Sequence, residues 1–268
     1  MAGKGLLLRA FLDTGSLPGG GYYSPLHPEL GCATLIPVPE EEAPNAAEGM
    51  DPSRWVDPCT GSPLERFMPY DRRWMLHNDP RLDLGFYTDY FAPRGRLPRR
   101  LGVKLGKGDV LGFVAGLAVY PEGFWERRRS LAEVRRAFRG AVAEGRAAVY
   151  VVGFIEVEAV VDISATGWST LLSVYPKLRE SPHYAREGDA PVAVIGQGYL
   201  VEPPCPASTP SASIDRQPPS ELLQRVAGRE AALAFSRSNY RRSRVLRLSA
   251  RQLAEELQRE GCSVKKPG

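Results

Sequence analysis

The apolar positions along the chain fall into runs that predict β-strands, and the residues between them indicate how deeply each strand is buried. Val110 to Tyr120 carries no charged residue, which indicates a strand that is covered on both faces. In Ala147 to Ile163, two apolar residues alternate with Glu156 and Glu158, so part of this longer strand has one face in water. Shorter runs predict further strands at Gly5–Phe11, Ala33–Val38, Arg72–His77, Val192–Val201 and Val245–Leu248.

Helices are predicted by a period of about 3.6 residues and by capping signals. The clearest begins at Ser130, where Glu133 completes a capping box, and it ends before Gly145. The apolar residues between these two ends fall on one helical face. Further helices are predicted at Trp168–Leu178, Ser220–Phe235 and Ser249–Glu260.

The order of these elements indicates an α+β fold. Strands and helices do not alternate regularly, so a doubly wound sheet is disfavoured, and we predict a curved mixed sheet or a small β-barrel with appended helices. The stretch Pro203–Pro219 is rich in Pro and Ser, as connections are. We therefore expect a strand-rich domain over residues 1–205 and a helical C-terminal extension over residues 206–268 that packs on it.

Composition places the chain among ordinary globular proteins, with 43% hydrophobic and 25% charged residues. No apolar run approaches the roughly 20 residues of a membrane-spanning helix, and Gly5–Phe11 is too short for a signal peptide. We therefore expect a cytoplasmic protein that does not bind a membrane.

The four cysteines, Cys32, Cys59, Cys205 and Cys262, lie far apart and form no CxxC pair, so the sequence predicts no zinc site and no cofactor. Intracellular proteins of hyperthermophiles do carry disulfides, and the sequence alone leaves a disulfide here open.

Basic residues are unevenly distributed, although the net charge is only +4. One basic stretch runs from Arg94 to Lys107 and another from Arg237 to Arg251, and arginine far outnumbers lysine. The planar guanidinium suits phosphate binding and base stacking, whereas a genome that favours arginine codons would give the same bias. As phosphate-binding residues the first stretch offers Arg94, Arg96, Arg99 and Arg100.

Each of the three histidines, His27, His77 and His183, lies close to a proline in a predicted loop. His77 is followed by Asn78 and Asp79, so that a base, an amide and a carboxylate are adjacent, a set suited to general acid–base chemistry or to orienting a sugar hydroxyl. The alternative is structural, with Asp79 capping a turn and His77 bonding locally.

Two loops could approach a ligand. Gly19–Gly21 leads into Tyr22 and Ser24, and backbone amides of such a loop can reach a phosphate or a base, although a flexible loop also explains it. It is neither a Walker A loop nor a dinucleotide fingerprint. From Phe86 to Lys107, aromatic residues are followed by arginines, as in surfaces that bind nucleic acids; a packed loop with a solvated basic flank is the alternative.

Seven short segments of the chain together resemble one known family. They are Arg9–Pro25, Leu35–Pro39, His77–Pro80, Phe86–Asp89, Leu105–Val110, Val149–Val157 and Ser181–Tyr184. In this order they resemble the nucleotide modification associated domain 3 family over roughly residues 5–205, although Arg81 and the Phe-Tyr-Thr-Asp sequence depart from the family's pattern. The resemblance implies a link to the modification of nucleic-acid bases, and the paired strands also resemble PUA and EVE domains, which hold a base beside a barrel.

These observations predict a protein that binds a nucleotide or modified base, with nucleic acid or a nucleotide as its partner. An enzyme that acts on a nucleotide through His77 and Asp79 is the first alternative, and a protein-interaction module with a basic surface is the second. The predicted ligand-binding residues are Gly20, Gly21, Tyr22, Ser24, Asn78, Tyr87, Asp89 and His183.

Overall fold

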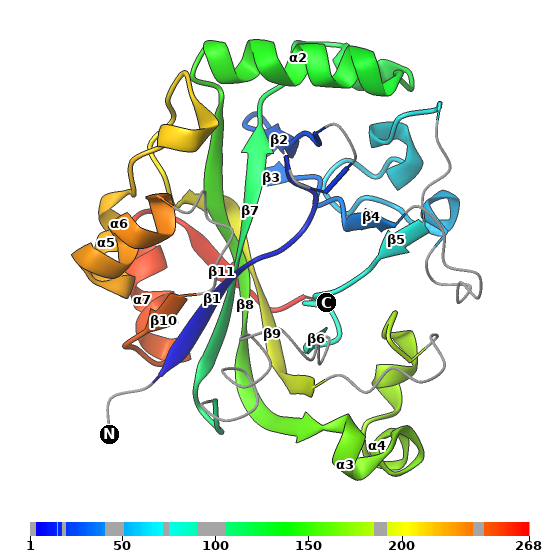
Figure 1. The fold of residues 1–268 in the computed structure, drawn as a ribbon, viewed down its shortest axis with the longest axis vertical. Coiled ribbons are helices and arrows are strands. Elements are labelled where there is room, and N and C mark those ends of the chain that lie inside the picture. The colour runs from blue at the N-terminus through cyan, green and yellow to red at the C-terminus, as the bar shows by residue number, and fades with distance from the viewer. Residues whose placement is uncertain are drawn as a thin grey trace.

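A strongly curled, mixed β-sheet of nine strands forms the centre of the molecule (Figure 1). The computed structural model describes residues 4–14, 16–17, 20–40, 51–71, 75–89, 105–184, 192–237 and 244–267. The strands of the sheet are β1 (Gly5–Arg9), β2 (Ser24–His27), β3 (Cys32–Ala33), β6 (Phe86–Asp89), β7 (Val110–Ala118), β8 (Ala147–Asp162), β9 (Val192–Pro206), β10 (Arg244–Leu246) and β11 (Ser263–Lys265). A separate small sheet pairs β4 (Val38–Glu40) with β5 (Met75–His77).

The main strand path runs β10-β1-β7-β8-β9-β11, with β2 joined to β7 and β6 joined to β9. Strand β7 runs parallel to β1 and β2, and the other pairs are antiparallel. All nine residues of β7 are buried, as expected for an uncharged strand at the centre of a sheet. The predicted α+β fold with a curved mixed sheet is therefore confirmed.

Helices cover the sheet at three places (Figure 1). The longest, α2, lies across the ends of β7 and β8, three helices cover one side, and two short ones lie at the far end of β8. The helices are α2 (Leu131–Ala143), α3 (Ile163–Thr166), α4 (Trp168–Val174), α5 (Glu221–Ala227), α6 (Arg229–Arg237) and α7 (Ala250–Arg259), and the 3-10 helices are η2 (Pro52–Arg54), η3 (Leu64–Phe67), η4 (Phe124–Glu126), η5 (Pro176–Glu180) and η6 (Ile214–Arg216).

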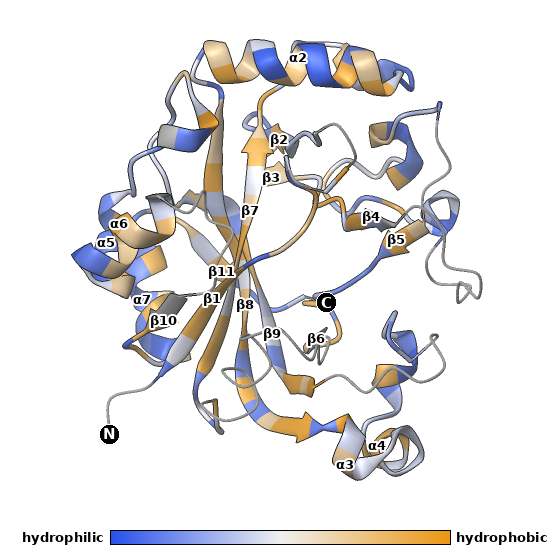
Figure 2. Cartoon of the chain, in the orientation of Figure 1, coloured by the Kyte–Doolittle hydropathy of each residue, from blue (hydrophilic) through white to orange (hydrophobic). Residues whose placement is uncertain are grey.

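Helix α2 follows its sequence signals. The Ser130 hydroxyl accepts from the N–H of Glu133 (3.3 Å), and the Glu133 carboxylate accepts from the N–H of Ser130 (2.8 Å), which is the predicted capping box. Apolar and polar residues alternate along the helix in Figure 2. Its buried residues are the predicted apolar face, Leu131, Val134, Phe138, Ala141 and Val142.

The strand predicted over residues 33–38 is wrong, because β3 ends at Ala33 and β4 begins at Val38. The backbone between them bonds to the first residues of β2 without forming a regular ladder. Thr34 N–H donates to Pro25 O (3.0 Å), and Ile36 N–H donates to the Ser24 hydroxyl (3.2 Å). Residues 34–37, which have the residue types of a strand, therefore form an irregular connection between β3 and β4.

Strand β9 extends to Pro206, beyond the predicted end at Val201 and into the segment predicted as a connection. Pro203 and Pro204 are tolerated because they lie where the register with β8 shifts, between the pairs Gly153–Leu200 and Val151–Cys205. Proline has no N–H for a ladder, so within a sheet it occurs at bulges and edges.

The helix predicted over residues 220–235 is two helices, α5 and α6. Gly228 separates them with φ +80°, a conformation that a residue with a side chain rarely adopts.

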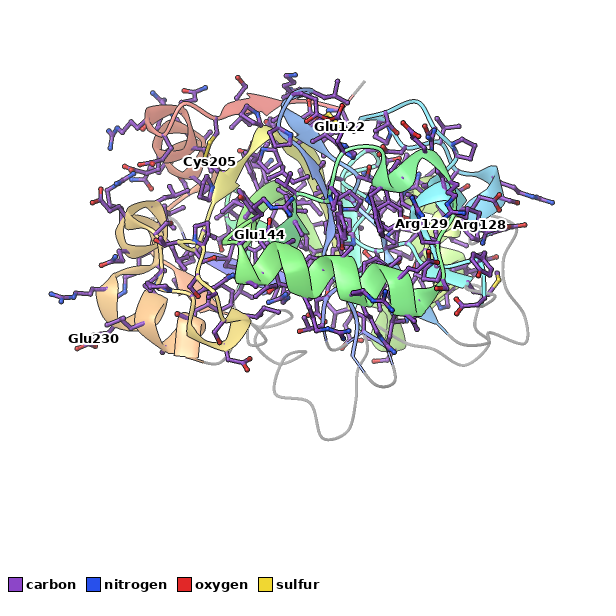
Figure 3. All side chains as sticks on the ribbon, turned by 90° about the horizontal axis from the view of Figure 1, so that it is seen from above. Glu122, Arg128, Arg129, Glu144, Cys205 and Glu230 are labelled. Atoms are coloured by element: carbon purple, nitrogen blue, oxygen red, sulfur yellow. A yellow bond between two sulfur atoms is a disulfide. The ribbon has the colours of Figure 1, made fainter. Side chains whose placement is uncertain are left out.

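Two disulfides join distant parts of the chain, which the sequence left open. Cys32 is bonded to Cys59, and Cys205 of β9 is bonded to Cys262, which lies just before β11. Figure 3 shows Cys205 on the side of the sheet covered by the C-terminal helices. The predicted C-terminal extension is therefore tied to the sheet covalently as well as through β10 and β11.

Candidate functional site

The first part of the candidate site is the turn that follows β5. This strand ends at His77, which pairs with Val38 of β4. The N–H of Asp79 donates to His77 O (2.8 Å), and the peptide between Asp79 and Pro80 is cis. His77 and Asp79 therefore lie at the two ends of one tight turn.

Thr88 of β6 holds the side chain of Asp79, which is only 5% exposed. Asp79 Oδ2 accepts from the backbone N–H of Thr88 (2.7 Å) and from the Thr88 hydroxyl. Thr88 itself pairs with Ala193 of β9. The carboxylate is thereby fixed relative to the main sheet, and charge-assisted bonds of this kind are among the stronger ones in proteins.

The hairpin between Asp79 and Thr88 packs directly on β9. Arg81 and Phe86 exchange backbone hydrogen bonds of 3.0 and 3.1 Å. A Cβ atom added at Gly198 would lie 1.8 Å from Leu82 O, so the backbones touch at this point. This contact fixes how far the turn that carries Asp79 stands from the sheet.

The third component is His183, which follows η5 and is 3% exposed. Its ring meets that of His77 edge to face, with centroids 4.9 Å apart and an angle of 80° between the planes. The N–H of His183 donates to the Ser181 hydroxyl (3.2 Å), and that hydroxyl lies 2.9 Å from the Thr88 hydroxyl. Hydrogen bonds through Ser181 and Thr88 thus connect the His183 backbone to the Asp79 carboxylate.

His77, Asp79 and His183 therefore form a compact cluster, in which one nitrogen or oxygen from each side chain lies within 4.8 Å of the others. His183 and Asp79 are buried, and His77 is half-buried. The arrangement provides two imidazoles and one oriented carboxylate, which is the donor set of a proton-transfer site or of a site for a transition metal ion.

Asn78 lies in the same turn and is 7% exposed. Within the described ranges, no hydrogen-bond acceptor lies within reach of its buried Nδ2 atom. A buried amide without a partner is costly, by about 1–3 kcal/mol, and such groups in native proteins call for an explanation such as a bound ligand or water.

Three of the predicted site residues thus meet, namely His77, Asp79 and His183, and Asn78 lies in the same turn. The sequence did not single out Thr88, which holds Asp79, or Ser181, which bonds to the backbone of His183. A signal was present, because both lie in segments quoted for the family resemblance, Phe86–Asp89 and Ser181–Tyr184.

The glycine loop and Tyr22 lie elsewhere and have structural roles. A Cβ at Gly21 would lie 1.8 Å from Asp13 O, so this glycine allows close backbone packing, and Gly20 has φ +98°. Tyr22 is 1% exposed, and its hydroxyl donates to Phe67 O (3.2 Å). Burial raises the pKa of Tyr22 well above its ordinary value, so the phenol stays neutral.

Ser24 is also fully buried, and its hydroxyl accepts from the N–H of Ile36 (3.2 Å). These contacts account for Tyr22 and Ser24 within the core, and neither presents a ring or hydroxyl for a base. We therefore leave both, together with the glycine loop, out of the candidate site.

Tyr87 and Asp89 lie on β6 on either side of Thr88. Side chains alternate along a strand, so the Tyr87 ring is on the face of β6 opposite to Thr88. It packs against Phe113, with ring centroids 5.4 Å apart. Asp89 pairs with Val192 through the backbone and ends the strand. Arg94, Arg96, Arg99 and Arg100 lie outside the described residues, so their phosphate-binding role stays a prediction.

A second cluster of metal-binding residue types contains His27, Asp57 and Cys59. Cys59 is in a disulfide, so its sulfur is not a thiolate. The Asp57 carboxylate accepts from the hydroxyls of Thr34 (2.8 Å) and Thr60 (2.7 Å), which closes the surrounding loops. These contacts give this cluster a structural role.

His27 also lines a cavity of about 700 Å³, together with residues of the segment that follows β7. Its lining includes the aromatic side chains of Phe67, Tyr120, Phe124 and Trp125. Figure 3 shows Glu122, which lines the cavity, and Arg128 and Arg129, which precede α2. The residues of the His77 cluster are not part of its lining.

A comparison with protein-family models, with curated protein sequences and with solved structures finds no match. Function therefore has to be inferred from the geometry of the chain itself. Among the described residues, no helix is long and apolar enough to cross a membrane.

Proposed function

We propose that the protein binds a nucleotide or a nucleic-acid base at the cluster of His77, Asp79 and His183, and acts on it there. The observation that carries this proposal is a convergence. Three short segments that resemble the nucleotide modification associated family are separated by up to about a hundred residues in the sequence. They meet at this one buried cluster, where the Thr88 and Ser181 hydroxyls lie 2.9 Å apart.

Three features of the cluster suit such a ligand. The amide of Asn78 has an unused donor for a base carbonyl or a phosphate oxygen. The half-buried ring of His77 provides an approach from one side, whereas His183 and Asp79 are shielded. The predicted basic stretch begins five residues beyond the end of β6, and its arginines suit the phosphates of a nucleotide.

The closeness of the two histidines favours chemistry over binding alone. Asp79 is oriented by Thr88, as a carboxylate that supports a neighbouring imidazole should be. A neutral imidazole can accept a proton from an attacking hydroxyl, while a protonated one can give a proton to a leaving group. Two rings 4.9 Å apart place both roles within reach of one small substrate.

The test is a titration of the purified protein with labelled single- and double-stranded DNA and RNA, with and without modified bases, at two salt concentrations. We expect the protein to bind one base or nucleotide more tightly than the others. Its affinity for that ligand should fall at least tenfold in Asp79→Asn. His27→Gln, the matched control in the other histidine cluster, should bind as the wild type does.

Mass spectrometry of the incubated ligand then shows whether it is changed. A preferred ligand that returns unchanged would leave a base-binding protein without catalysis. Absence of binding to every nucleic acid and free nucleotide would overturn the proposal, and it would favour the interaction module with a basic surface.

A further inference from the structure

We propose that His77, Asp79 and His183 are the protein ligands of a single divalent transition metal ion. This inference rests on the proposed function for the choice of the site. It does not depend on the site binding a nucleotide. The sequence predicted no metal, because the cysteines form no CxxC pair and no histidine lies at ligand spacing.

The donor set indicates the class of ion. Two imidazoles and one carboxylate are bound by Zn²⁺, Fe²⁺, Co²⁺ or Mn²⁺, whereas Mg²⁺ and Ca²⁺ prefer oxygen ligands. Three protein ligands leave at least one coordination position for water or a substrate, which is typical of catalytic rather than structural sites.

The geometry is close to that of a bound site. Two ligand atoms that each lie about 2.0–2.2 Å from a tetrahedral ion are about 3.3 Å apart. The three candidate ligand atoms here lie within 4.8 Å of one another. Closing the difference takes a movement of at most about 1.5 Å, which side-chain rotation in the half-buried His77 can provide.

The surroundings orient the ligands as metal sites require. Asp79 is held by two donors from Thr88, and the Thr88 hydroxyl continues to Ser181, which in turn accepts from the backbone of His183. Carboxylate ligands in metal sites are themselves hydrogen-bonded in this way, and the loss of such a partner lowers metal affinity by about 10–100-fold.

Asn78 independently indicates that a polar ligand or water binds in this turn. Its side chain is more than nine-tenths buried, and its Nδ2 atom has no acceptor among the residues that the structure describes. Asn78 stands between two of the proposed ligands in the sequence, and a buried donor of this kind calls for an acceptor such as a water or a bound ligand.

With an ion bound, the histidines would coordinate it instead of exchanging protons, so another group would have to transfer the proton. A water molecule on the ion would be the group that loses a proton near neutral pH. Dependence on metal therefore distinguishes the two mechanisms at the same site.

The test uses the full chain stripped with a chelator and then titrated with Co²⁺, whose visible absorption reports its coordination, followed by displacement with Zn²⁺. We expect one Co²⁺ per chain, Zn²⁺ displacement, and no displacement by Mg²⁺. Asp79→Asn and His183→Gln should each weaken Co²⁺ binding by more than about tenfold. His27→Gln should leave it unchanged.

His183 is buried, and its substitution could disturb folding. Thr88→Val is therefore included, because it keeps all three ligands and should still weaken Co²⁺ binding by about 10–100-fold. Circular dichroism and the unfolding midpoint of each variant, measured without metal, separate misfolding from loss of a ligand.

The inference would be overturned if the wild type did not bind Co²⁺ stoichiometrically. It would also be overturned if the folded Asp79→Asn and Thr88→Val variants bound Co²⁺ as tightly as the wild type does. If a nucleotide is bound and changed equally well by protein kept in chelator, the metal inference fails and the proposed function stands. If Co²⁺ binds as expected and no nucleotide does, the metal site stands and the proposed function fails.

Discussion

Thr88 donates both its backbone N–H and its hydroxyl to the same carboxylate oxygen of Asp79, Oδ2. The two residues are nine positions apart, and they join the turn after β5 to a strand of the main sheet. The stability of the hairpin between them and the orientation of the candidate site therefore depend on the same pair of contacts.

Replacing the hydroxyl tests this dependence. Thr88→Val should lower the free energy of unfolding by about 1–3 kcal/mol, because a buried carboxylate oxygen loses a donor while its desolvation remains. Thr88→Ser keeps the donor and should lose less. Urea denaturation of the three proteins measures the difference, and an unchanged free energy of unfolding in Thr88→Val would contradict a stabilising role for the hydroxyl.

The contact between the hairpin and β9 can be tested at a glycine. In Gly198→Ala the new Cβ would overlap Leu82 O, which is backbone and cannot rotate away. We expect a loss of more than about 2 kcal/mol in the free energy of unfolding, because overpacking of this kind forces backbone shifts. Ligand binding at the neighbouring Asp79 should weaken in parallel.

Gly140 in α2 is the matched control for that substitution. Nothing lies within 4 Å of a Cβ added there, and its φ is that of a helix. Gly140→Ala should therefore raise the free energy of unfolding by about 0.5–1 kcal/mol, through the higher helix propensity of alanine. If both alanines destabilise the protein equally, close packing at Gly198 is not the cause.

The disulfides predict a response to reductant. A loop-entropy estimate gives about 3.5 kcal/mol for Cys32–Cys59, which closes 27 residues, and about 4.2 kcal/mol for Cys205–Cys262, which closes 57. Dithiothreitol should therefore lower the denaturant midpoint of the wild type. Replacing both cysteines of one disulfide by alanine should reproduce part of this decrease. A denaturant midpoint that is the same with and without dithiothreitol would show that the disulfides do not form.

His27 predicts a pH dependence of stability. Burial lowers the pKa of His27, against the opposing effect of the Asp57 and Glu29 carboxylates. The unfolded chain therefore takes up this proton at a higher pH than the folded protein does, and stability is lost as the pH falls below about 6.5. Between pH 8 and pH 5 the wild type should lose more stability than His27→Gln. Parallel curves would contradict the shift.

The sequence predicts elements well where a local signal decides them. The capping box at Ser130 and the uncharged run of β7 are set by neighbouring residues, and both predictions are confirmed. The strand predicted over residues 33–38 failed because Thr34 and Ile36 bond to residues earlier in the chain, which no local pattern records. The same limit applies to β9, whose prolines are accommodated by a bulge opposite β8.

The candidate site shows a similar division. The sequence singled out His77, Asp79 and His183 by residue type, and only the fold shows that they meet. Tyr22 illustrates the opposite case, because an aromatic residue beside a glycine loop has the same composition whether its ring faces solvent or lies in the core. Which occurs depends on the packing of remote segments such as η3.

The C-terminal segment also determines when the sheet can be completed. Strand β10 covers the outer edge of β1, and β11 pairs with β9, so both ends of the main strand path receive their last strand from residues 244–265. On the ribosome, these edges stay open until that segment emerges, and open edges are templates for pairing with other chains. The risk of aggregation through these two edges therefore lasts until residues 244–265 have been made and have paired, even though most of the core precedes them in the chain.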